Sequence, residues 1–159
     1  MPGARGGLRM VRVMATGVFD LLHAGHLYYL EKAKELGDEL IVVIARDSTV
    51  RKQKHEPITS EKMRMALVES LKPVDKAVLG KEGDMYDIVM DIKPDIIALG
   101  HDQPYDPEKI KTELKKRGLE VEVKRLPHLN GDLDGTRKIV KKILNLWTFS
   151  KEMERIEKK

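Results

Sequence analysis

The run from 39 to 45, with the sequence ELIVVIA, constrains the fold of this chain more than any other segment. It is almost continuously apolar and follows the helix-stopping pair Gly37 and Asp38. A strand with one solvent-exposed face alternates apolar and polar side chains, whereas a continuously apolar strand is buried on both faces. Such a strand needs helices on each side of its sheet, so this run predicts a parallel α/β architecture.

The rest of the chain alternates short apolar runs with amphipathic segments. We expect strands at 11–16, 39–45, 75–79, 95–99 and 119–126. We expect helices at 27–36, from 59–61 to about 71, at 85–92, 107–117 and 136–146, with a polar loop at 46–57. This alternation favours a Rossmann-like parallel sheet with helices on both faces. The expected organisation is a flexible leader at 1–8, a single domain at 9–146 and a helical tail at 147–159.

The composition excludes several classes of protein. With 41% hydrophobic and 35% charged residues, the chain is typical of a globular domain and not of a disordered one. A net charge of +4 is too mild and dispersed to indicate nucleic acid, but it suits a site that collects phosphates. The absence of cysteine excludes disulfides, thiolate nucleophiles and cysteine metal sites. No apolar run approaches the ~20 residues of a membrane span, so the expected location is cytoplasmic.

Unusual residues gather in the loops that follow the expected strands. In a parallel sheet, ligands bind beyond the carboxyl ends of the strands. The loops at this edge are 17–26, 46–54, 100–103 and 129–137. The position of these loops and the chemistry of their residues therefore predict one ligand site at this edge of the sheet.

The first of these loops ends in a histidine motif at the start of a helix. His23 and His26 are three residues apart and therefore lie on the same side of the turn, with Gly25 between them. A helix N-terminus offers free N–H groups and a positive dipole to a phosphate, and the glycine lets phosphate oxygens approach the backbone. Two imidazoles there can stabilise the charge that grows in phosphoryl transfer. A zinc site is the weaker alternative, since a third ligand is not evident.

The pattern Gly17-x-Phe19-Asp20 followed by His23-x-Gly25-His26 resembles the signature of the cytidylyltransferase-like nucleotidyltransferases, and the similarity runs from 11 to about 146. The resemblance implies the nucleotidyltransferase (HUP) type of the fold. It also implies that an acceptor phosphate attacks the α-phosphorus of a nucleoside triphosphate and that pyrophosphate leaves. The nucleotide would contact the first motif, which comprises Gly17, Val18, Phe19, Asp20, His23, Ala24, Gly25 and His26.

The same resemblance implies roles for three later segments. Lys54, in the basic loop, would neutralise phosphates, and Arg64 on the following helix matches a nucleotide-binding arginine of the family. Gly100 and Asp102 are similar to the family's Gly-x-Asp loop, in which the aspartate contacts the nucleoside. A solvated loop is the alternative for Lys54, and a turn or capping residue for Asp102.

The start of the last expected helix is similar to the Ser/Thr-rich turn that holds the β- and γ-phosphates. Thr136 would bind phosphate there, and Arg137 would act with His23, His26 and Lys54 as a catalytic cation. Asp134 and Gly135 replace hydroxyl residues of the family. A solvated helix charge is the alternative for Arg137.

Three phrases, at 45–50, 71–80 and 93–103, resemble the archaeal FAD synthase family. That resemblance implies ATP and FMN as substrates and a divalent cation, Mg²⁺, that bridges the triphosphate; no residue is assigned as a metal ligand. A cytidylyltransferase acting on glycerol-3-phosphate or another polyol phosphate remains the alternative enzyme. A nucleotide-binding module without catalysis is the second alternative. Apolar residues of the tail, Trp147, Phe149 and Ile156, could serve a homodimer.

Overall fold

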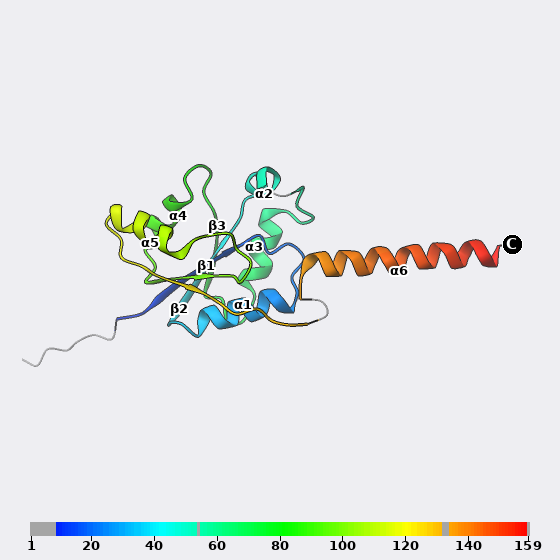
Figure 1. Cartoon of the computed structure of the whole chain (residues 1–159), viewed down its shortest axis with the longest axis horizontal. Helices are drawn as coiled ribbons and strands as arrows, with labels where there is room; N and C mark the ends of the chain where they lie inside the picture. Colours follow the sequence, from blue (N-terminus) through cyan, green and yellow to red (C-terminus); the bar gives the residue numbers. More distant parts are fainter. Residues whose placement is uncertain (1–8, 54, 132–133, 159) are drawn as a thin grey trace, which may run out of the picture.

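A five-stranded parallel sheet forms the centre of the computed structural model, which describes residues 9–53, 55–131 and 134–158. Its strand order is β3-β2-β1-β4-β5 (Figure 1). The strands are β1 (Arg12–Gly17), β2 (Glu39–Ile44), β3 (Lys76–Leu79), β4 (Ile96–Leu99) and β5 (Glu122–Arg125). The helices are α1 (Ala24–Lys34), α2 (Asp47–Gln53), α3 (Glu61–Glu69), α4 (Tyr86–Ile92), α5 (Pro107–Lys116) and α6 (Thr136–Glu157). The expected leader, 1–8, lies outside the described residues.

Helices cover both faces of the sheet, as the apolar run of β2 predicts. Every residue from Leu40 to Ile44 is buried. On one face, Leu30 of α1 and Val68 of α3 pack with alternate sheet residues. On the other face, α4 and α5 supply a second core, with Val89 and Leu114 among its members. The Rossmann-like fold class is confirmed.

The register places the first two strand ends side by side. Arg12 pairs with Glu39 and Gly17 with Ile44, so the loops after β1 and β2 leave the sheet at the same level. Both loops emerge at the carboxyl edge, where the site is expected. None of the helices among the described residues combines the length and the apolar content of a membrane span.

Two expected elements differ from the structure. The polar loop at 46–57 contains α2, which begins at Asp47 and buries Val50. A helix that buries so little leaves no apolar periodicity in the sequence, so the pattern could not reveal it. The helix expected at 136–146 is present and continues through the expected tail to Glu157, but it is not a core helix, because none of the residues of α6 is buried. Figure 1 shows α6 extending away from the sheet.

Candidate active site

The loop after β1 makes a strained turn around Asp20. Phe19 and Leu21 have φ of 57° and 55°, a region that side chains rarely adopt. The turn directs the Asp20 carboxylate at the segment before α3, where it accepts bonds from the Ile58 amide (2.6 Å), the Thr59 amide (3.0 Å) and the Thr59 hydroxyl (2.6 Å). Burial opposes ionisation of Asp20, but these hydrogen bonds and the charge of Arg64 outweigh it and lower its pKa. Asp20 thus anchors the loop as an ionised side chain.

His23 and His26 cap the first turn of α1 reciprocally. Nδ1 of His23 accepts from the Gly25 amide (3.0 Å) and more weakly from the His26 amide (3.4 Å). Nδ1 of His26 accepts from the His23 amide (3.3 Å), and the rings stack with centroids 3.7 Å apart. A neutral imidazole whose Nδ1 accepts carries its proton on Nε2. The cap therefore fixes both rings in the tautomer that has an Nε2–H donor.

The His23 ring is held in its neutral form. Burial lowers the pKa of His23 below its ordinary 6.5, and the carboxylate of Asp134 offsets this in part. At neutral pH the ring therefore offers a hydrogen-bond donor without a full positive charge. Such preorganised donors suit an oxygen on which negative charge develops.

The segment before α6 lies against this motif. A Cβ at Gly25 would lie 2.4 Å from the carbonyl oxygen of Asp134, so only glycine permits this approach. The hydroxyl of Thr136 donates to the Asp20 carbonyl over 2.9 Å. The N-terminus of α6, capped by Gly135 without a side-chain bond, therefore lies beside the first motif. Two helix N-termini converge here, which favours an anion.

A second histidine joins this region through Asp134. The Asp134 carboxylate contacts Nζ of Lys138 at 2.5 Å and Nε2 of His128 at 2.9 Å. The ring of His128 lies against that of His101, with centroids 3.9 Å apart. Lys138 and then His128 lower the pKa of Asp134. Sequence reasoning missed His128, whose one signal is its place after the last strand.

The loop after β4 is fixed by Gln103. Its side chain accepts from the Gly100 amide (2.9 Å) and donates to the Thr16 carbonyl (2.8 Å), which joins the ends of β4 and β1. Arg125 donates to the carbonyls of Gly100 and Gln103 from the neighbouring strand. Asp102 is left with 77% of its side chain exposed at this edge. Asp102 is thus accessible to a ligand.

The comparisons with known proteins agree with this geometry. The profile of the cytidylyltransferase-like family matches residues 14–156. An FAD synthase from Aciduliprofundum boonei is 58% identical over 137 residues, which are 86% of this chain and 92% of that protein. An FAD synthase from Methanobrevibacter ruminantium is 55% identical over 139 residues, and the match covers 85% of this chain and 93% of that protein.

The chain belongs to the FAD synthase family. A crystal structure from Thermoplasma volcanium, described as a lipopolysaccharide core biosynthesis protein, is 51% identical with a TM-score of 0.75, and the match covers 77% of this chain and all of that one. A pantoate-beta-alanine ligase from Francisella tularensis, 17% identical with a TM-score of 0.52, shares the fold; the match covers 76% of this chain and 60% of that one.

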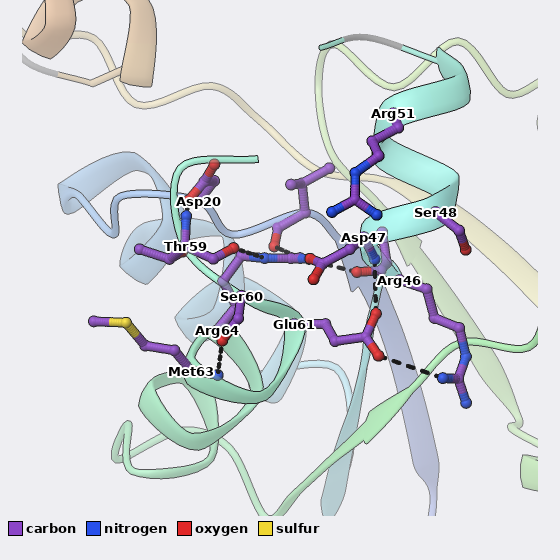
Figure 2. A network of polar contacts seen from close by, with 12 residues as sticks. Asp20, Arg46, Asp47, Ser48, Arg51, Thr59, Ser60, Glu61, Met63 and Arg64 are labelled. Atoms are coloured by element: carbon purple, nitrogen blue, oxygen red, sulfur yellow. Dashed lines mark hydrogen bonds and ion pairs between the residues drawn. The ribbon is translucent and has the colours of Figure 1, made fainter. Parts of the chain in front are cut away.

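Arg64, a predicted nucleotide ligand of this FAD synthase family member, is buried and cross-links several loops. Its side chain has no exposed surface and donates to the carboxylate of Asp47 (2.6 Å). It also donates to the carbonyls of Val18 (2.7 Å), Ala45 (2.9 Å) and Thr59 (3.1 Å). Figure 2 shows it enclosed by these segments. Arg64 therefore positions the loops after β1 and β2, and its predicted contact with the nucleotide stays a prediction.

Of the two other cations predicted to bind phosphate, the structure describes only Arg137. Lys54 lies outside the described residues. Arg137 is exposed in the first turn of α6, and no ion-pair partner for it occurs in the part of the chain that the structure describes. The same part contains no group of three or more His, Cys, Asp or Glu residues that could hold a metal ion.

Proposed function

We propose that this chain is an FAD synthase, which transfers the adenylyl group of ATP to FMN and releases pyrophosphate. The paired Nε2–H donors of His23 and His26, fixed by their reciprocal cap, are the observation that carries the proposal. The FAD synthases of A. boonei and M. ruminantium, which match over most of this chain, support ATP and FMN as the substrates.

ATP would lie across the strand ends with its phosphates between the N-termini of α1 and α6. The Nε2–H donors of His23 and His26 would bind the α- and β-phosphates, because the amides of His23, Gly25 and His26 are already bonded within the cap. Thr136 and Arg137 would hold the departing pyrophosphate, with Lys54 from the basic loop. Gly100 and Asp102 would contact the nucleoside. The exposure of Asp102 and Arg137 at the carboxyl edge supports these assignments.

The chemical step is a direct displacement at phosphorus. A phosphate oxygen of FMN forms a bond to the α-phosphorus of ATP, and the bond from that phosphorus to the α–β bridging oxygen breaks. The electron pair leaves with pyrophosphate. FMN phosphate is already anionic at neutral pH, so a strong general base is not needed. His23 and His26 would donate hydrogen bonds to the oxygens that gain charge.

We infer that the divalent cation enters with its substrate, as Mg–ATP. The carboxylates nearest the histidine motif already have partners: Asp20 accepts from Ile58 and Thr59, and Asp134 from Lys138 and His128. Mg²⁺ binds through phosphate oxygens and few protein carboxylates in such sites. We also infer a cytoplasmic location for this enzyme.

The test incubates the protein with FMN, ATP and MgCl₂, and follows FAD by chromatography and pyrophosphate by a coupled assay. FAD and pyrophosphate should appear in equal amounts. If neither forms from ATP but CTP and a polyol phosphate yield pyrophosphate, the chain is a cytidylyltransferase. Tight ATP binding without turnover on any acceptor would identify a non-catalytic module.

A further inference from the structure

Asp134 is an unexpected residue beside an anion site. It directly precedes the N-terminus of α6, where the proposed function places pyrophosphate, and only 3% of its side chain is exposed. A carboxylate there repels phosphate. Its charge reaches the histidine motif, because it offsets part of the fall that burial causes in the pKa of His23. An acid that works against the ligand at this position needs another role.

Both carboxylate oxygens of Asp134 have a partner. Oδ1 accepts from Nζ of Lys138 over 2.5 Å, and Oδ2 lies 2.9 Å from Nε2 of His128. An ionised carboxylate only accepts, so the imidazole nitrogen that faces it carries a proton. Nζ of Lys138 also donates to the carbonyl of Gly131 over 3.2 Å. The three side chains of Asp134, His128 and Lys138, which we name the Asp134 clamp, thus join the segment after β5 to the first turn of α6.

The clamp fixes the place where α6 begins. The carbonyl oxygen of Asp134 lies so close to Gly25 that a Cβ there would be 2.4 Å away. Two residues later, the Thr136 hydroxyl donates to the Asp20 carbonyl over 2.9 Å. Gly135 gives the helix no side-chain cap, which favours an anion as the acceptor for the N–H groups of this turn. The position of Asp134 therefore sets the position of these N–H groups relative to the histidine motif.

His128 extends the clamp to the loop after β4. Its ring lies against the ring of His101, with centroids 3.9 Å apart and planes inclined by 41°. His101 stands between Gly100 and Asp102, the two residues that the proposed function assigns to the nucleoside. One imidazole thus contacts the loop at the nucleoside end of the site and the carboxylate at its pyrophosphate end.

We infer that His128 and Asp134 are positioning residues of the nucleotide site, which hold the loop after β4 and the N-terminus of α6 at the spacing that one ATP molecule spans. The inference rests on the proposed function for the identity of the ligand. Ligand-binding groups are held in place by neighbours whose own side chains are fixed by hydrogen bonds. The clamp also accounts for an acid at a turn where the family resemblance implies hydroxyl residues, because the carboxylate binds the protein and not the phosphates.

Two substitutions of Asp134 separate the clamp from its charge. Asp134→Asn and Asp134→Ala both remove the negative charge, but the asparagine oxygen can accept from Lys138 and its amide can donate to His128. Loss of charge alone should tighten the binding of Mg–ATP equally in both variants. We expect the Kd for Mg–ATP, measured by calorimetry without FMN, to be several-fold higher for Asp134→Ala than for Asp134→Asn. Equal values of Kd in the two variants would overturn the inference.

Substitutions of His128 test the link to the loop after β4. His128→Ala removes both the donor to Asp134 and the ring beside His101, whereas His128→Gln keeps an N–H that can reach the carboxylate. His128→Ala should raise the Kd for Mg–ATP several-fold, and His128→Gln should restore part of the affinity. His55→Ala is the matched control and should bind as the wild type does, because His55 is exposed and its ring contacts the carbonyl of its neighbour Glu56. A wild-type Kd in His128→Ala, or no recovery in His128→Gln, would contradict the role of His128.

Steady-state kinetics distinguish positioning from catalysis. In Asp134→Ala and His128→Ala the KM for ATP should rise while kcat stays close to the wild-type value, because neither side chain touches the reacting atoms. A lower kcat at an unchanged KM would overturn the positioning role. A wild type that makes no FAD, but whose affinity for Mg–ATP depends on the clamp, defeats the proposed function alone. An active wild type whose clamp variants bind Mg–ATP equally well defeats this inference alone.

Discussion

The guanidinium of Arg64 donates to the carboxylate of Asp47 over 2.6 Å from a side chain that has no exposed surface. Asp47 begins α2, and Arg64 lies in the first turns of α3. Burial alone would raise the pKa of Asp47, but the hydrogen bond and charge of Arg64 outweigh it and lower that pKa. One buried cation thus joins the helices on either side of the basic loop to the ends of β1 and β2.

Arg64→Met should destabilise the fold and disorder the site together. It leaves the Asp47 carboxylate and three loop carbonyls without their donor, a loss of about 3 kcal/mol in the free energy of unfolding. Urea denaturation measures the change. Arg51→Met is the matched control, because Arg51 pairs with Glu56 on the surface, where solvent screens the pair, and its loss should change stability far less. Equal losses in the two variants would remove Arg64 from its positioning role.

His26→Asn should separate capping from catalysis. The asparagine oxygen can take the place of Nδ1 and accept from the His23 amide, but no donor remains at the Nε2 position. We expect kcat to fall by about 10²-fold with little change in stability. His26→Gln keeps a donor near the Nε2 position but loses the cap. It should therefore retain a higher kcat than His26→Asn and lose roughly 1 kcal/mol in the free energy of unfolding. The reverse ranking of kcat would show that His26 acts through the cap.

Stability should depend on pH through His23. Its pKa is lower in the folded chain than the ordinary 6.5, so the unfolded chain binds the proton more readily. The contribution of the neutral His23 ring to the free energy of unfolding is complete above pH 6.5. It is lost as the pH falls through the lower pKa of the folded chain. Urea denaturation of wild type and His23→Asn over this window should give unfolding free energies that converge in acid. Curves that stay parallel would assign the acid sensitivity to other groups.

Gly25→Ala should push the start of α6 away from the histidine motif. The new methyl carbon would lie 2.4 Å from the Asp134 carbonyl oxygen, and overpacking of this kind costs about 1–3 kcal/mol. We expect a lower Tm and a raised KM for ATP, because the two helix N-termini separate. At Gly131 a Cβ would have its nearest contact at 3.9 Å, so Gly131→Ala should change neither value. An unchanged KM in Gly25→Ala would mean that the approach of Asp134 does not matter for ATP.

The sequence by itself determined the parallel sheet and the histidine motif that begins α1. A buried apolar strand and a glycine between histidines are local patterns whose physical meaning does not depend on distant partners. All five expected strands are present in the described structure, and the two most apolar of them, β2 and β4, are also the most buried. The histidines that cap α1 are likewise those that the motif singled out.

The tertiary structure decided what the polar side chains do. Arg64 and a ligand-binding arginine look the same in sequence, and only the approach of the loops after β1 and β2 shows that this guanidinium is enclosed. His128 meets Asp134 across a loop, and Gly25 meets the Asp134 carbonyl from a segment far along the chain. The solvent exposure of α6 also follows from where the helix points and not from its composition. Polar contacts and burial depend on three-dimensional proximity, which the periodicity of a sequence does not encode.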